Sequence, residues 1–257
     1  MADPALTALN ALLRRSSVED DNEALKLATA AINASKGTDL TAQRARVVAL
    51  LKLDRFDDAL RAIADAGSIL DKTCLLEKAY ALYKTGQLEA AEAALQNAGP
   101  GSNVRALKHV AAQVAYRAEH SDKAAAIYRD LVANQEGANY GEESDLRINL
   151  LATNAQLEWQ GKGWAVPDEQ KNPARDDLEV FELAYNAACG CISRGDFSKA
   201  AILLKRSRDL CEALEDLTED ERKAELLPIL VQQAYVSIKL GKIDEAASLQ
   251  KLIVLSE

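Results

Sequence analysis

The sequence has few of the residues that interrupt helices or carry catalysis. Its 257 residues include 12 glycines, 5 prolines, 4 cysteines and 2 histidines, and aromatic residues make up only 5%. Scarce glycine and proline favour an all-α fold, because both residues destabilise a helix interior. His109 and His120 lie about three helical turns apart, so they are poorly placed to share a metal, and no further histidine exists to complete a catalytic triad.

Long apolar runs and positive charge are also missing. No segment approaches the roughly 20 apolar residues of a membrane-spanning helix, and the N-terminus lacks the basic start and cleavage site of a signal peptide. We therefore expect a cytoplasmic protein without membrane insertion. The net charge of −9 and the pI near 5.0 oppose direct binding of a polyanion, which requires clustered Lys and Arg.

The cysteines and glycines do not form a recognisable cofactor site. Cys74, Cys189, Cys191 and Cys211 lie in apolar helical runs, which predicts reduced, buried thiols. Two of them are two residues apart, so on a helix they point roughly 200° apart and cannot easily hold one ion. The glycines follow predicted helices and form no phosphate-binding loop. We expect no cofactor, no metal and no enzymatic activity.

What the sequence does contain is a repeated element, in which a turn is followed in most copies by an apolar residue and, three residues later, an alanine; the copy at Ala24 is weaker, and the copy at Ala124 has Ser121 in the apolar slot. The alanines Ala24, Ala59, Ala91 and Ala124 are separated by 35, 32 and 33 residues, and further copies place Ala200 and Ala246 in the same slot. That spacing fits one helical hairpin per step. An ordinary helix bundle, the alternative, would not keep it.

The residue types at these positions have a physical reason. Helices pack at about 8–10 Å, and a contact that close leaves no room for a side chain larger than alanine. Gly86, Gly195 and Gly241 each precede such a segment. They are expected to end the first helix of a hairpin in the left-handed conformation that suits glycine.

The pattern resembles the tetratricopeptide repeat. The resemblance implies a right-handed superhelical solenoid of helical hairpins. We expect it to extend as a single domain over residues 1–257 and to be the N-terminal part of a longer protein.

The spacing breaks between Ala124 and Ala200. "EESDLRINLLATNAQLEW" (142–159) predicts a helix, and Gly161, Gly163, Pro167 and Pro173 then predict an irregular insertion over about 160–177. Trp164 lies in this insertion. It is expected either to pack against a neighbouring helix or to contact a partner, and both interpretations stay open.

Two further local features concern turns and helix ends. Residues 97–103 ("NAGPGSN") predict a turn between repeats. Thr218 and Glu221 have the spacing of a capping box, and Pro228 is expected to bend the following helix or to mark a restart.

In such a solenoid the first helices of the hairpins line the concave face. Five of the seven tyrosines fall on that face, beside His109, Lys239 and other basic groups. The predicted peptide-binding residues are Arg44, Lys52, Tyr80, Tyr83, Lys84, Gln113, Tyr116, Arg117, Asn149, Tyr185, Asn186 and Tyr235. Tyrosine is favoured at interfaces, although the alternative that these tyrosines only fill space between helices stays open.

Asparagine offers a donor and an acceptor that match a peptide unit, and tetratricopeptide repeats often bond a peptide backbone from the slot of Asn186. Asn149 is its expected equivalent one unit earlier. Val48 and Glu77 stand where a clamp for a terminal carboxylate would need polar and basic groups. This argues against the chaperone-binding version of the repeat.

The segments "LEKAYALYKTGQLEAAEAAL", "IYRDLV", "YNAAC" and "DLCEALED" occur in this order. Together with the insertion after Trp159, they resemble the 72-kilodalton subunit family of the eukaryotic signal recognition particle. The resemblance implies a protein-binding scaffold that grips the C-terminal segment of the 68-kilodalton subunit, as part of a heterodimer that targets ribosomes to the endoplasmic reticulum. It also implies that RNA contact belongs to a basic region downstream in that family. The alternative is an adaptor for another client, such as a chaperone or trafficking complex.

Overall fold

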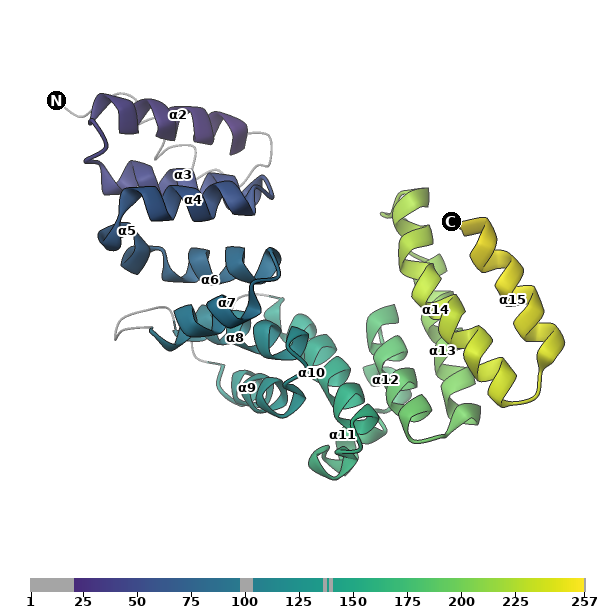
Figure 1. Cartoon of the computed structure of the whole chain (residues 1–257). Coiled ribbons are helices and arrows are strands. Elements are labelled where there is room, and N and C mark those ends of the chain that lie inside the picture. Colours follow the sequence, from purple (N-terminus) through teal and green to yellow (C-terminus); the bar gives the residue numbers. More distant parts are fainter. Residues whose placement is uncertain (1–20, 98–103, 136–137, 139–140, 257) are drawn as a thin grey trace. The chain divides into compact units, whose positions relative to one another are not determined.

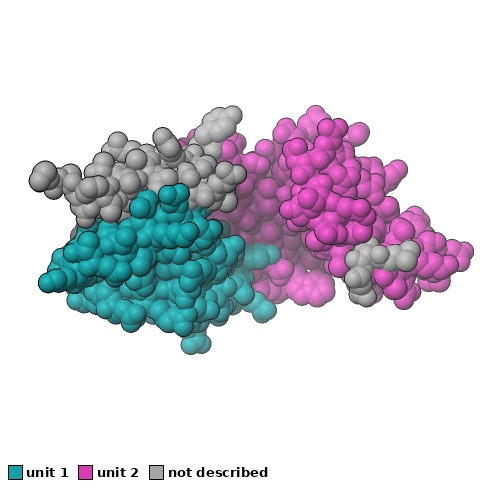
Figure 2. Space-filling view, turned by 90° about the horizontal axis from the view of Figure 1, so that it is seen from above, with its two compact units in different colours: residues 1–119 teal, residues 120–257 magenta. Residues whose placement is uncertain are grey.

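The computed structural model describes residues 21–97, 104–135, 138 and 141–256. Within these ranges the chain forms helices joined by turns, with no strand (Figure 1), so the predicted all-α class is confirmed. The chain divides into two compact units, unit 1 (residues 1–119) and unit 2 (residues 120–257), which are coloured separately in Figure 2. The sequence predicted no boundary at this position, and a single right-handed superhelix over both units stays a prediction.

Unit 1 consists of successive antiparallel helices. They are α2 (Asp21–Ala34), α3 (Leu40–Lys52), α4 (Phe56–Ala66), α5 (Ser68–Thr73), α6 (Leu75–Lys84), α7 (Leu88–Gln96) and α8 (Val104–Arg117). α3 pairs with α4 and α6 pairs with α7 across short turns, and α6 also contacts α3 and α8. First helices of neighbouring repeats are therefore in contact within this unit.

Unit 2 contains the irregular insertion. Its elements are α9 (Ser121–Ala133), α10 (Glu142–Trp159), η2 (Gly163–Ala165), α11 (Asp168–Lys171), η3 (Arg175–Asp177), α12 (Phe181–Ser193), α13 (Phe197–Glu212), α14 (Glu219–Lys239) and α15 (Ile243–Ser256). The predicted helix over 142–159 is confirmed. Residues 160–177, where the sequence predicted an irregular insertion, contain single turns of 3₁₀ and α-helix.

The repeated alanines lie where the spacing placed them. Ala59, Ala91, Ala124 and Ala200 are completely buried, and Ala24 and Ala246 are nearly so. Four of these six lie in described hydrophobic clusters with residues of the adjoining helices, namely Ala24, Ala59, Ala91 and Ala200. The alanine slot is therefore the tight contact of each hairpin.

Each hairpin turn has the same backbone conformation. Gly86, Gly195 and Gly241 have φ of 78°, 78° and 75°, and each lies two residues before the next helix. Asp54 (φ 55°) and Glu119 (φ 62°) occupy the same place in their turns. The left-handed conformation predicted for the glycines is confirmed, and in two copies it is imposed on residues that normally avoid it.

Helix α14 shows one expected and one unexpected feature. The Thr218 side chain accepts a hydrogen bond from the Glu221 backbone N–H, and the Glu221 carboxylate accepts one from the Thr218 N–H, which confirms the capping box. The helix then continues through Pro228 as one element, so a restart at this proline is wrong. The turn predicted over 97–103 lies outside the described residues, apart from Asn97.

Candidate protein-binding surface

In unit 1, five of the aromatic and basic side chains of α4, α6 and α8 form a continuous series that we call the aromatic row: Phe56, Tyr80, Tyr83, Lys84 and Arg117. The rings of Phe56 and Tyr80 meet edge to face with centroids 6.1 Å apart, and the Tyr83 ring lies 6.4 Å beyond. Lys84 Nζ lies 5.3 Å from the centroid of Phe56, and the Arg117 guanidinium lies 5.5 Å from that of Tyr83. Sequence reasoning selected four of these residues and missed Phe56.

The tyrosines of the aromatic row serve two purposes. Tyr80 and Tyr83 are half-buried against the cluster that includes Ala79, Val110 and Val114. They therefore do fill space between helices, as the alternative interpretation held. Each ring nevertheless keeps an accessible part, and the cations at the two ends of the row are exposed.

Two other predicted binding residues of unit 1 are already engaged in ion pairs. Arg44 donates to Glu77 Oε1 at 3.0 Å, and Lys52 lies 3.4 Å from Asp21 Oδ1. Glu77 is buried while the Arg44 side chain is 53% exposed. A buried carboxylate needs such a partner, so Glu77 holds Arg44 as a link between α3 and α6. This agrees with the argument against a terminal-carboxylate clamp.

The remaining predicted residues of unit 1 lie on α8. His109, Gln113 and Tyr116 are half-buried, and they follow one another at helical spacing toward Arg117. They share a helix with one end of the aromatic row. Their part in binding stays a prediction.

In unit 2 the predicted residues lie on α10, α12 and α14. Asn186 donates from Nδ2 to the Ile148 carbonyl at 3.2 Å, which ties α12 to α10. Asn149 and Tyr185 are half-buried. A peptide that bonded the Asn186 amide N–H would have to replace this internal bond, a cost that the sequence did not reveal.

Tyr235 belongs to an arrangement like that of unit 1. Its ring meets that of Phe197 edge to face at 6.2 Å, and Lys239 Nζ lies 5.3 Å from the Tyr235 centroid. Tyr235 is 38% exposed. As with Phe56, the sequence pattern did not select Phe197 for binding, because it opens the second helix of its hairpin and binding residues were expected on the first helices.

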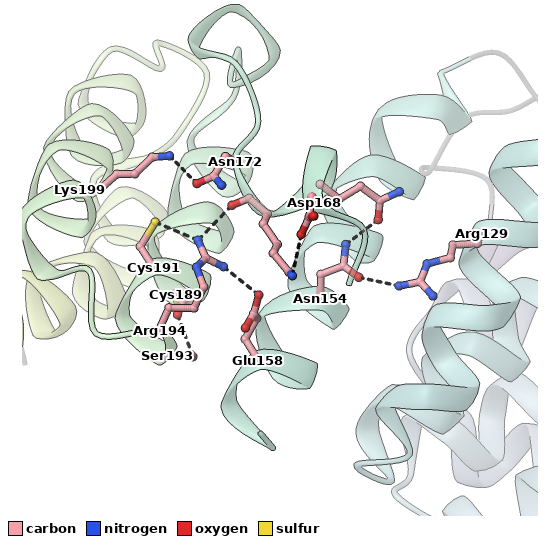
Figure 3. Close-up of polar contacts among 12 residues, drawn as sticks. Arg129, Asn154, Glu158, Asp168, Asn172, Cys189, Cys191, Ser193, Arg194 and Lys199 are labelled. Carbon is pink, nitrogen blue, oxygen red and sulfur yellow. Dashed lines mark hydrogen bonds and ion pairs between the residues drawn. The ribbon is translucent and has the colours of Figure 1, made fainter. Parts of the chain in front are cut away.

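Polar contacts fasten the insertion to the helices of unit 2 (Figure 3). Arg194 donates to Glu158 Oε1 and to the Lys171 carbonyl, both at 3.0 Å, and Lys199 donates to Asn172 Oδ1 at 2.6 Å. The buried Asn154 of α10 donates to Gln170 Oε1 at 2.9 Å, and Arg129 of α9 donates to the Ala165 carbonyl at 3.0 Å. These bonds act together with the burial of Val166 against Ala125 and Leu157, and they give the insertion a defined position.

Trp164 does not contribute to that fastening. Its side chain is 83% exposed, and Trp159 at the end of α10 is 69% exposed. The interpretation that Trp164 packs against a neighbouring helix is wrong, because the buried apolar contact of the insertion is made by Val166 with Ala125 and Leu157 instead. Contact with a partner, the other interpretation, stays a prediction.

The cysteines are free, and Cys74, Cys191 and Cys211 are buried while Cys189 is half-buried. Burial raises the pKa of Cys74 and of Cys189 to about 11, and it also raises the pKa of Cys191 and of Cys211. In the described part of the chain, no group of three His, Cys, Asp or Glu side chains is placed to hold a metal ion. The described helices include none with the length and apolar character to cross a membrane.

Residues 17–156 match the family model SRP_TPR_like, described as "Putative TPR-like repeat". The chain belongs to this family. It is 33% identical over 242 residues to the signal recognition particle subunit SRP72 of Canis lupus familiaris and 32% identical over 242 residues to that of Homo sapiens. Each match covers 91% of this chain and 34% of the relative, so the chain spans about a third of the length of these SRP72 proteins. The family predicted from the sequence is confirmed.

Among solved structures, the chain is similar to the apo form of the quorum sensor NprR from B. thuringiensis. The TM-score is 0.58 at 13% sequence identity, over 98% of this chain and 86% of the other. At that identity the likeness concerns the fold alone. Together with the SRP_TPR_like match, it supports a helical-repeat fold.

Proposed function

We propose that the chain is a non-catalytic, protein-binding scaffold of the signal recognition particle. Through its repeats it grips an extended C-terminal segment of the 68-kilodalton subunit and so contributes to assembly of the particle in the cytoplasm. The similarity to SRP72 over nearly all of this chain is the observation that carries the proposal. The aromatic row supports it, because accessible tyrosine and arginine are typical of protein interfaces.

The acidic composition fits a protein partner better than RNA. A net charge of −9 repels phosphate, and strong RNA binding depends on several Lys and Arg contacts. We therefore assign contact with the particle's RNA to a region outside these residues.

Calorimetric titration with the C-terminal region of the 68-kilodalton subunit tests the proposal. We expect a dissociation constant below about 1 μM, which corresponds to about −8 kcal/mol. Tyr83→Ala and Asn186→Ala should each weaken binding, because one removes a ring of the aromatic row and the other an amide beside α10. Asn33→Ala, at an exposed position of α2, is the matched control.

Failure of the folded chain to bind this region at micromolar concentration would refute the partner. Binding that Tyr83→Ala and Asn186→Ala leave unchanged would instead refute the assigned surface. Circular dichroism of each variant separates loss of binding from loss of fold.

A further inference from the structure

The same arrangement of a phenylalanine, a tyrosine and a lysine is built once in each unit. Phe56 meets Tyr80 at 6.1 Å and an interplanar angle of 77°, and Phe197 meets Tyr235 at 6.2 Å and 71°. In each case the phenylalanine is the first residue of a second helix, and the lysine follows the tyrosine by four residues. Lysine at that spacing lies on the tyrosine's side of the helix, and it reaches over one ring of the pair.

The cations of these arrangements differ from several basic groups of unit 1. In unit 1, Arg44, Lys52 and Lys78 are paired with carboxylates. Over the described residues, by contrast, no carboxylate lies within salt-bridge distance of Lys84, Arg117 or Lys239, and all three side chains are exposed. The aromatic rings orient these charges. Arg117 also donates from Nη1 to the Tyr83 carbonyl at 2.8 Å, and none of the three cations is neutralised by a carboxylate of the described residues.

The distribution of charge along the chain separates the two units. Residues 1–119 contain 15 basic and 15 acidic side chains, so the whole surplus of nine negative charges lies in residues 120–257. An acidic ligand therefore meets no net repulsion from unit 1. Unit 1 also offers two oriented cations in its aromatic row, whereas the arrangement in unit 2 offers one.

We propose that the aromatic row of unit 1 is a docking site for an acidic stretch of an extended partner segment. Carboxylates of that stretch pair with Lys84 and Arg117, and an apolar side chain between them lies against Tyr80 and Tyr83. Because the row crosses α4, α6 and α8, its ligand runs across the helices as an extended chain. The site deepens the proposed function and rests on it for the partner, but its chemistry is tested without that partner.

Charge complementarity is the reason for proposing an acidic ligand. An exposed cation held over a ring has already lost part of its rotamer freedom. Pairing it with a carboxylate therefore costs less side-chain entropy than pairing a lysine that moves freely. Tyrosine contributes a rigid apolar body with a polar tip beside that pair. A basic or uncharged segment would leave both cations without a counter-charge in the complex.

The test uses two synthetic peptides, one repeating Glu-Phe-Pro and the other repeating Gln-Phe-Pro, titrated against the whole chain at low and at physiological salt. We expect the glutamate peptide to bind about tenfold tighter and to lose more affinity with added salt. Lys84→Glu should lower its affinity about tenfold, because one ion pair is replaced by a repulsion. Lys72→Glu, an exposed lysine of α5 outside the row, makes the same change in net charge and should have little effect.

Equal binding of the two peptides would overturn the proposal, as would equal effects of Lys84→Glu and Lys72→Glu. Lys239→Glu distinguishes the units, because an effect larger than that of Lys84→Glu would place the acidic site in unit 2 and contradict the assignment. If the chain prefers the glutamate peptide but does not bind the 68-kilodalton region, the proposed partner is refuted and the acidic docking site is supported. Binding of the 68-kilodalton region by a chain that shows no preference for the glutamate peptide would support the proposed partner and refute the acidic docking site.

Discussion

Arg117 holds Tyr83 in two ways at once. Its Nη1 donates to the Tyr83 carbonyl at 2.8 Å, and its guanidinium lies 5.5 Å from the centroid of the same residue's ring. Tyr83 is the penultimate residue of α6, where carbonyls lack partners within the helix and a positive charge is favourable. One side chain of α8 therefore caps the end of α6 and orients a tyrosine of the aromatic row.

Replacing Arg117 should weaken both functions. We expect Arg117→Ala to lower the free energy of unfolding by about 1 kcal/mol, because one exposed, charge-assisted bond is lost. Arg117→Lys keeps the charge but not the planar donor, and should fall between Arg117→Ala and the unchanged chain. Urea unfolding followed by circular dichroism measures the series, and equal stability of all three proteins would show that the contact contributes nothing.

The alanine slot offers a matched pair of neighbouring positions on α7. Ala91 is completely buried and Ala90 is exposed. Ala91→Leu should lower stability by about 1–3 kcal/mol by overpacking the contact between helices. Ala90→Leu adds the same side chain on the solvent side and should change stability by less than about 0.5 kcal/mol. Thermal unfolding of the two variants tests this prediction. Similar melting temperatures would contradict the close packing at Ala91.

The insertion of unit 2 depends on a glycine beside the ion pair of Glu158 and Arg194. A Cβ at Gly163 would overlap the Glu158 carboxylate, which accepts from Arg194 at 3.0 Å. The carboxylate is the end of a flexible side chain, so we expect Gly163→Ala to displace it and break the pair. Stability should fall by about 1 kcal/mol.

A double-mutant cycle with Arg194→Ala isolates that effect. When Arg194 is already absent, Gly163→Ala has no pair left to break and should cost clearly less. Fully additive changes in the free energy of unfolding would mean that the glycine is required for another reason.

The thiols should be unreactive in the folded chain near neutral pH. Burial raises the pKa of Cys74 and of Cys189 to about 11 from an ordinary value of 9.0, so almost no thiolate is present at pH 8. Reaction with a chromogenic disulfide should be slow at pH 8, rise toward pH 11 and be fast in denaturant. Cys74→Ala and Cys189→Ala identify the individual thiols, and rapid modification of the native chain at pH 8 would contradict their burial.

The same shift predicts the direction of a pH effect on stability. Below about pH 9 both the folded and the unfolded thiols are protonated, so they add no dependence. Between about pH 9 and 11 the unfolded chain loses these protons first, and the free energy of unfolding should fall. Cys74→Ala should show a shallower decline than the unchanged chain when urea midpoints are compared across this range.

The parts of the fold that depend on neighbouring residues were predictable from the sequence. Ala91, Gly86 and the helix over 142–159 were found because alanine spacing, left-handed turns and helical periodicity are all local signals. Asp54 and Glu119, which are not glycine, keep the same register as the glycines, because each lies five residues before an alanine of the repeat.

Contacts between distant segments were not predictable in the same way. The bond from Asn186 to Ile148 joins residues 38 apart in the sequence, and the pair of Arg44 with Glu77 joins residues 33 apart. Helical periodicity predicts which face of a helix a side chain lies on, but not which residue of a neighbouring helix it contacts. The sequence left two interpretations of Trp164 open for a related reason. Whether a large side chain in an irregular segment finds an apolar neighbour depends on the whole path of the chain.

Asp54 and Glu119 also have a consequence for protein engineering. Each adopts a backbone conformation that costs a residue with a Cβ about 1–2 kcal/mol and costs glycine almost nothing. Their side chains are exposed, so no buried packing depends on them. Glycine at these two positions should therefore raise the melting temperature of the chain.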